Sequence, residues 1–150
     1  MYNCVTVEGS TKTKRQLVRE IAYFCVDEML PKFRTLDVEI NLIKLKDETN
    51  CDGLCSPGDY RNHFEIDIEK SLKGDDLITC VTHEMVHVMQ YAKGMLKDNN
   101  TAGSKVYWKG YCYSNYAYSK QPWERQAYRM QETLLIKYKQ WSKNNGNRTT

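Results

Sequence analysis

The sequence predicts an α+β domain built from a small antiparallel or mixed sheet and several helices. Two segments alternate apolar and polar residues, as half-buried strands do, and three longer segments repeat apolar residues at helical spacing. Along the chain they run helix, strands, helix, short strand, helix, an order typical of α+β proteins. No internal repeat or linker divides the chain, so we expect residues 1–150 to form a single domain.

The first half of the chain is expected to contain one helix and two strands. Thr13 to Gln16 fit a capping box, which predicts that a helix begins near Thr13, and Pro31 marks its end. The alternation in residues 36–42 predicts a strand, and the run 63–69 predicts a second one. In this second strand the apolar side chains would face the core and the polar ones the opposite side: Phe64, Ile66 and Ile68 against His63, Glu65, Asp67 and Glu69.

The second half is expected to begin with a helix that follows Gly74. Asp75 or Asp76 would cap its N-terminus, because aspartate accepts hydrogen bonds from the first free backbone amides. Gly94 would end it after about Lys93, since glycine readily adopts the left-handed conformation that closes a helix.

Two further elements are expected near the C-terminus. The segment 105–113 is short, aromatic and rich in β-formers, which favours a strand with a kink or bulge at Gly110. A last helix would open at Pro122, because proline suits the first turn, and would continue to about Trp141. The polar tail 144–150 is expected to be disordered.

Composition and charge exclude several classes of protein. The formal net charge is only +3 and the basic residues are spread along the chain, so nucleic-acid binding is not expected. No apolar run approaches the roughly 20 residues that span a bilayer, and the N-terminus lacks the pattern of a secretion signal. We expect a cytoplasmic protein without membrane contacts, and a monomer. One local basic excess is interpreted as a solvated face, with a phosphate-binding or partner-binding patch as the alternative: Lys12, Lys14, Arg15 and Arg19.

The six cysteines do not indicate a disulfide framework, since the chain is long and lacks a secretion signal. Cys25 and Cys80 lie among apolar helix residues and are interpreted as buried thiols. The spacing of Cys51 and Cys55 would suit a metal or a small-loop disulfide, but no second pair with ligand spacing follows. We interpret these two as free thiols in a turn, because residues 53–59 are rich in turn signals.

One motif in the second predicted helix carries chemistry. His83, Glu84 and His87 form the pattern H-E-x-x-H. Positions i and i+4 lie one above the other on a helix, so both imidazoles can reach one metal ion. Glu84 can instead contact a water on that ion and accept its proton. Two of the chain's three histidines fall in this window, and a chance match is expected in well under ~1% of such chains.

A catalytic zinc site needs a third protein ligand and an open coordination position. Downstream of His87 the chain offers three acids, Asp98, Glu124 and Glu132, and no histidine. Asp98 is expected in a solvated turn and Glu132 on an exposed helix face. Glu124 starts a helix that could pack beside the motif helix, although glutamate is commonplace in a first helical turn. Glu124 is therefore the first candidate, with His63, a cysteine and Glu132 as alternatives.

The motif and two downstream segments together resemble a known enzyme family. The 83–87 motif followed by Pro122-Trp123-Glu124 resembles the gluzincin branch of zinc metallopeptidases, in which a helix supplies the glutamate ligand. With Trp108-Lys109-Gly110 between them, the chain looks most like small zincin-like proteins of bacteriophage and bacterial genomes. The resemblance covers about residues 60–130. It implies a zincin-like fold with an active-site helix and a third-ligand helix, a location in the host cytoplasm if the protein is phage-encoded, and a Zn²⁺ cofactor held by His83, His87 and Glu124.

The chain departs from the gluzincin pattern at one position. Many gluzincins place an aspartate four residues after the glutamate ligand to orient a zinc-bound histidine, and here that position is Tyr128. A tyrosine hydroxyl, a backbone carbonyl or another acid is expected to take this part. Peptide deformylase is similar only in Gly53-Leu54-Cys55-Ser56, with a different residue order and without its glycine-rich segment. An SprT-like protease would add another histidine ligand or a zinc ribbon, and this chain has neither.

The resulting prediction is a zinc metallopeptidase that hydrolyses peptide bonds of a peptide or protein substrate. Glu84 would act as general base and then as general acid. A further donor would stabilise the oxyanion, and four tyrosines are candidates: Tyr113, Tyr116, Tyr118 and Tyr128. The sequence does not choose among them, and we name Tyr128 first because it lies one helical turn from Glu124.

Two expectations concern substrate and catalysis. By the resemblance, the strand 63–69 would line the substrate cleft, and its acidic residues mildly favour basic substrates. The alternative to the enzyme is a non-catalytic zinc-binding domain with a zincin fold, whose ion would serve structure or interaction only.

Overall fold

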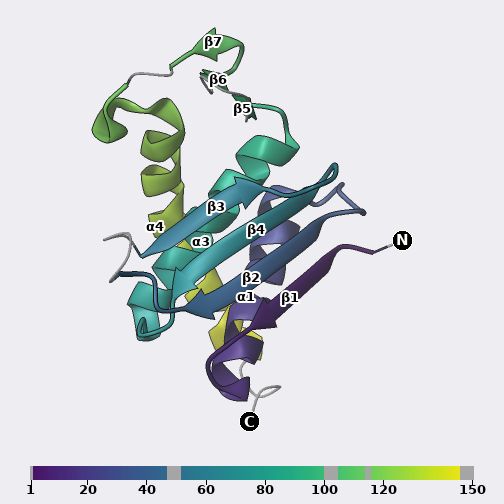
Figure 1. Cartoon of the computed structure of the whole chain (residues 1–150). Helices are drawn as coiled ribbons and strands as arrows, with labels where there is room; N and C mark the ends of the chain where they lie inside the picture. Colours follow the sequence, from purple (N-terminus) through teal and green to yellow (C-terminus); the bar gives the residue numbers. More distant parts are fainter. Residues whose placement is uncertain (1, 47–51, 100–104, 114–115, 146–150) are drawn as a thin grey trace.

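The predicted α+β class is confirmed by a computed structural model, which describes residues 2–46, 52–99, 105–113 and 116–145 (Figure 1). The first strands and helices are β1 (Cys4–Glu8), α1 (Lys12–Met29), β2 (Asp37–Ile43), β3 (Gly53–Pro57), β4 (His63–Glu69) and α3 (Gly74–Ala92). They are followed by β5 (Leu96–Asn99), β6 (Lys105–Trp108), β7 (Tyr111–Cys112), the short 3₁₀ helix η1 (Tyr118–Lys120) and α4 (Pro122–Asn145).

The main sheet is mixed, with strand order β1-β2-β4-β3. β1, β2 and β4 run parallel, and β3 pairs antiparallel with β4 at the edge. The connection from β1 to β2 passes through α1, as a parallel pair requires a crossover. Helices α1 and α3 lie against one face of this sheet, and α4 packs beside α3 (Figure 1). None of the described helices combines the length and apolar character needed to cross a membrane.

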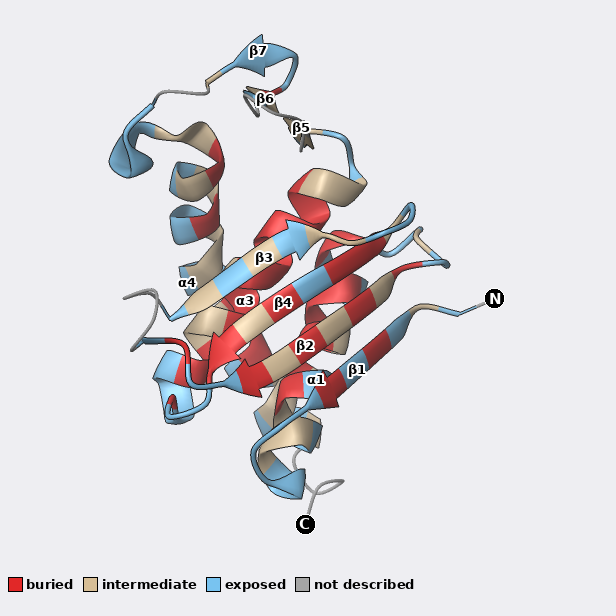
Figure 2. Cartoon of the chain, viewed as in Figure 1, coloured by how far each residue is buried: buried red, intermediate tan, exposed pale blue. Residues whose placement is uncertain are grey.

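The core lies between this sheet face and the helices, because every second strand residue points there. Strand register aligns these residues in rows across the sheet, one of which joins Val7, Ile40, Ile66 and Cys55. The predicted orientation of 63–69 is confirmed, since its three apolar side chains are at most 4% exposed: Phe64, Ile66 and Ile68. Figure 2 shows buried residues alternating with exposed ones along β1 and with mostly intermediate ones along β2, whereas β4 is buried at both ends.

A second, three-stranded antiparallel sheet, β5-β6-β7, follows the end of α3. The predicted single strand over 105–113 is wrong, because Lys109 and Gly110 form a two-residue turn between β6 and β7. Both have positive φ, 49° and 88°, which matches the right-handed twist of the joined strands. Asp98 lies in β5 and not in a solvated turn. The sheet packs on the start of α4 through a buried cluster of Leu96, Trp108 and Trp123.

The predicted helix boundaries needed small corrections. α1 begins at Lys12 because the hydroxyl of Thr11, not Thr13, accepts a hydrogen bond from the Lys14 amide. α3 has Lys73 at its cap position without a side-chain bond, and the two predicted capping aspartates lie in its first turn: Asp75 and Asp76. There they still favour the helix dipole.

At the C-terminus, α4 extends to Asn145, beyond the predicted end at Trp141, so the first two residues of the expected tail are helical. Residues 146–150 lie outside the described part of the chain.

The edge strand β3 was not predicted. Gly53, Ser56 and Pro57 indicated a turn, but the backbone pairs with β4 over five residues. Cys55 is therefore a free thiol in a strand, with its side chain on the helix face of the sheet. Its predicted companion Cys51 lies outside the described residues.

Candidate metal centre

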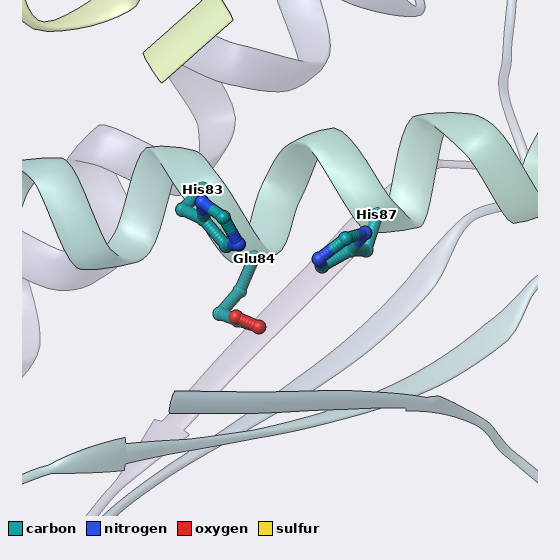
Figure 3. Close-up of side chains that lie close together, drawn as sticks. All are labelled: His83, Glu84 and His87. Carbon is teal, nitrogen blue, oxygen red and sulfur yellow. The ribbon is translucent and has the colours of Figure 1, made fainter. Parts of the chain in front are cut away.

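Helix α3 positions the H-E-x-x-H side chains beside the sheet. Its apolar stripe is buried against the core, and Met85 and Val88 are fully buried. The two imidazoles project from the same side of the helix, one turn apart, as Figure 3 shows. The ligand atoms of His83, Glu84 and His87 all lie within 4.8 Å of one another.

Helix α4 brings a carboxylate to this pair of histidines. Glu124 Oε1 lies 3.0 Å from His83 Nε2 and 3.2 Å from His87 Nε2. The helix approaches closely here because Ala127, one turn further, is fully buried, and Trp123 anchors the first turn. Glu124, the candidate chosen from sequence, is thus the downstream acid that meets both imidazoles.

The orientation of His87 is set by a buried amide. Gln90 is fully buried, and its Nε2 donates to the Trp123 carbonyl and to Gln126 Oε1, both at 2.9 Å. Its oxygen therefore faces His87 Nδ1, 2.8 Å away. An amide oxygen only accepts hydrogen bonds, so Nδ1 must carry the proton and the neutral ring keeps a lone pair on Nε2.

His83 is oriented in the same way from the other helix. Its Nδ1 lies 2.6 Å from Gln131 Oε1 of α4. The ring of Tyr128 contacts the His83 ring edge-on, with centroids 4.7 Å apart. The Nδ1 atoms of both rings therefore face side-chain amides. The sequence had predicted a tyrosine hydroxyl, a backbone carbonyl or an acid in this part. Gln90 and Gln131 were missed, although Gln90 lies three residues after His87, on the same helix face.

The electrostatics of the site favour a cation between these atoms. With Nδ1 protonated, both Nε2 lone pairs face a carboxylate oxygen, an arrangement that needs a proton or a metal ion between the acceptors. Burial opposes ionisation of Glu124, but hydrogen bonds from His83 and His87, donated when Nε2 of each ring is protonated, hold its pKa at about 2. Burial also lowers the pKa of His87, yet contacts with Glu124 and Glu84 outweigh it and raise that pKa.

Glu84 lies against the edge strand. It is 4% exposed, and burial raises its pKa despite the two neighbouring imidazoles. Its side chain extends from the helix toward the strands (Figure 3). A Cβ added at Gly53 of β3 would lie 3.0 Å from Glu84 Cγ and 2.9 Å from Cys80 Sγ. The absence of a side chain at Gly53 thus leaves room for Glu84.

Of the four candidate tyrosines, two lie at the site. The Tyr118 hydroxyl donates to Glu124 Oε1 at 3.0 Å and lies 3.2 Å from the Tyr128 hydroxyl. Burial, the bond with Tyr128 and the charge of Glu124 raise the pKa of Tyr118, so it remains a proton donor. Tyr113 packs instead on Trp123, and Tyr116 packs on Tyr113: neither has a described contact with the metal-site side chains.

The other proposed ligands lie elsewhere or remain unused. Glu132 is exposed on α4, as expected, and His63 lies on the sheet face opposite α3. Cys55 points toward the site, and burial together with the charges of Glu84 and Glu124 raises its pKa, so it is a neutral thiol.

The expected cleft strand is also corrected. Residues 63–69 form β4, an internal strand, and the edge beside α3 is β3. The acids of β4 at Glu65 and Asp67 lie on the far face of the sheet from the histidines, because they alternate with the core residues. They do not line this site, and the expected preference for basic substrates loses its basis.

Comparisons with known proteins add no identification, because no protein-family model, curated protein or solved structure matches the chain.

Proposed function

We propose that this chain is a zinc metallopeptidase with a zincin-like fold. One observation carries the proposal: two Nε2 atoms, oriented by amide oxygens, converge within 3.2 Å of one carboxylate oxygen beside a buried glutamate. Two histidines and a glutamate are the donor set of many catalytic zinc sites, which keep a fourth position open. His83, His87 and Glu124 would hold the ion.

The donor geometry fits zinc. Bonds of about 2.0–2.2 Å at a tetrahedral angle separate two ligand atoms by roughly 3.3 Å, close to the contacts that Glu124 makes with both imidazoles. The amide partners of the imidazoles supply the outer support that zinc-binding histidines commonly have. When bound, zinc supplies Lewis-acid polarisation of the scissile carbonyl and acidifies a water.

The remaining chemistry belongs to the chain's own residues. Glu84 takes a proton from the attacking water and passes it to the leaving amine; its raised pKa suits both transfers. The hydroxyls of Tyr118 and Tyr128, adjacent to Glu124, are the donors available to a developing oxyanion. In this proposal Tyr118 shares the part with Tyr128, because the Tyr118 hydroxyl contacts Glu124 directly.

The edge strand supports a peptide as substrate. β3 pairs with β4 on one side only within the described sheet, which leaves backbone groups on its other side for an added strand. Its residues Gly53 and Cys55 face the helix side near Glu84. A peptide that pairs with β3 would therefore pass beside the metal-site side chains.

Zinc stoichiometry and hydrolysis together test the proposal. We expect about one zinc per chain in the wild type, a loss of zinc in Glu124→Ala, and retention in the matched control Glu132→Ala, whose side chain is exposed. Glu84→Gln should keep the ion and reduce peptide hydrolysis by at least ~10³-fold. Unchanged zinc affinity in Glu124→Ala would overturn the third-ligand assignment.

The same variants separate the enzyme from a non-catalytic zinc domain. If zinc only stabilises the fold, Glu84→Gln would change neither stability nor any activity of the wild type, and a broad peptide library would remain uncut. If the protein is an enzyme, the wild type cuts at least one library peptide, and the zinc-loaded Glu84→Gln variant does not.

A further inference from the structure

The segment that contains the small sheet, residues 93–112, carries an unbalanced positive charge. Residues 93–112 contain four lysines and one aspartate, a net +3 that equals the formal net charge of the whole chain. The remainder of the chain is therefore balanced. The lysines are exposed in the structure: Lys93, Lys97, Lys105 and Lys109.

Part of this charge lies on one face of the small sheet. Lys97 of β5 pairs directly with Tyr107 of β6, so both side chains lie on the same face. The neighbouring pair, Leu96 and Trp108, points to the opposite face and is buried against Trp123. Asp98 shares the Leu96 face by strand alternation, which leaves the Lys97 face without that acid.

A hollow of about 370 Å³ opens on this face, and none of the described residues that line it is acidic. Its walls are Gly94, Met95, Lys97, Tyr107, Lys109 and Gly110. Lys109, in the turn between β6 and β7, also lines the hollow, and its Nζ lies 5.4 Å from the centre of the Trp108 ring. A Cβ at Gly110 would meet no atom within 4 Å, so this residue borders open space.

The small sheet carries the hollow on one face and packs against the start of α4 through the other. Trp108 lies 6.4 Å from Trp123, ring centre to ring centre, and Trp123 directly precedes Glu124. A polypeptide whose scissile bond reaches the histidines thus has this sheet as a neighbour. Two hollow-lining lysines suit one or two carboxylates better than a nucleic acid, which usually engages a longer row of basic residues.

We propose that this hollow binds an acidic segment of the polypeptide substrate, outside the metal centre. The inference rests on the proposed peptidase function, because the bound polypeptide is a substrate only if the protein is a peptidase. The binding itself requires no turnover. The acids of β4 lie on the face of the main sheet that points away from the histidines. The small sheet, which carries the basic face, packs on the first turn of α4.

Binding of a fluorescent hexaglutamate peptide to zinc-loaded Glu84→Gln protein tests the proposal without hydrolysis. We expect saturable binding that weakens with salt. Lys97→Gln/Lys109→Gln, which removes charge but keeps side-chain length, should weaken it about fivefold to tenfold. The control pair Lys32→Gln/Lys143→Gln removes the same charge from other exposed positions and should change it less than twofold.

Three outcomes would overturn the proposal: no binding of hexaglutamate, equal weakening in both pairs, or tighter binding of an oligothymidylate that depends on the same two lysines. The last result would assign the hollow to nucleic acid. Far-ultraviolet circular dichroism checks that each variant is folded. Because zinc content is measured separately, a failure here leaves the metal-site proposal intact, and a failure there leaves the peptide-binding result intact.

Discussion

Two clusters of histidine and carboxylate occur among the described residues, and they differ in the hydrogen bonds of their imidazole rings. Ligand atoms lie within 4.8 Å of one another both in His83, Glu84 and His87 and in the open-face cluster, which consists of Glu39, His63 and Glu65. In the open-face cluster His63 Nδ1 accepts a hydrogen bond from the Asp59 amide at 3.0 Å. Its Nε2 then carries the proton and donates to Glu39, 3.0 Å away.

The difference shows that the partner of the second ring nitrogen decides what a histidine can bind. A backbone amide at Nδ1 places the proton on Nε2, where it blocks a metal. A glutamine oxygen at Nδ1 places the proton there and leaves Nε2 free to bind one. Proximity of donor atoms is therefore an insufficient criterion, and the outer hydrogen bonds distinguish the two clusters.

The largest expected effect separates the two clusters directly. His87→Ala should lower zinc content from about one ion per chain to near zero, because two ligands rarely retain the ion. His63→Ala should leave zinc content unchanged, since its ring is proton-blocked on the opposite sheet face. Inductively coupled plasma mass spectrometry after dialysis measures both. Loss of zinc in the His63 variant would break the comparison.

The next effect tests the amide that orients His87. Gln90→Leu leaves His87 Nδ1 and the Trp123 carbonyl without their buried partner. We expect zinc affinity to fall about 10–100-fold and unfolding free energy to fall by about 2–4 kcal/mol.

Gln90→Glu sharpens this test, because it keeps an acceptor for Nδ1 and removes the donor to Trp123. It should retain more zinc affinity than the leucine variant. Competition with a chromogenic chelator and urea unfolding measure the two quantities, and exposed Gln140→Leu is the control. Equal zinc affinity in the wild type and in Gln90→Leu would show that the amide does not prepare His87.

A smaller effect concerns the room left for Glu84. Gly53→Ala adds a methyl group 2.9 Å from Cys80 Sγ and 3.0 Å from Glu84 Cγ, so the side chains must shift. We expect zinc content to persist, unfolding free energy to fall by about 1–2 kcal/mol, and peptide hydrolysis to fall by about tenfold. Ser56→Ala, exposed on the same strand, is the control. Full activity in Gly53→Ala would show that Glu84 tolerates displacement.

The smallest effect compares two carboxylates that share a low pKa for different reasons. Glu69 accepts backbone hydrogen bonds from Leu45, Lys46 and Ser71, which hold its pKa at about 2. Because the folded-state pKa is lowered, Glu69 contributes stability above its unfolded pKa of about 4.3. That contribution is lost as the pH falls toward 2.

Urea unfolding between pH 6 and pH 2 measures this contribution in wild type and Glu69→Gln. Their stability difference should be largest near pH 6, shrink as the pH falls, and stay the same in zinc-free protein. The Glu124 carboxylate, by contrast, faces imidazoles, and its contribution should respond to zinc. A pH-independent difference for Glu69→Gln would contradict the assignment of its low pKa.

Local patterns predicted the long elements well and the short ones poorly. The residues of β4 alternate over seven positions, and its predicted bounds are those observed. β3 has five residues, including glycine, serine and proline, and its pairing with β4 provides a partner that local sequence does not reveal. β5 and β6 were missed or merged for the same reason, since each has only four residues.

The sequence was sufficient for the spacing of His83 and His87, because helical geometry relates residues four apart without any distant contact. It also reduced the downstream acids to a few, of which Glu124 was preferred. Tertiary structure alone decided that α4 lies close enough to place Glu124 against both rings, and that Gln90 and Gln131 face their Nδ1 atoms. The physical reason is that backbone periodicity acts locally, whereas tautomer, burial and convergence of ligand atoms depend on how two helices, distant along the chain, pack together.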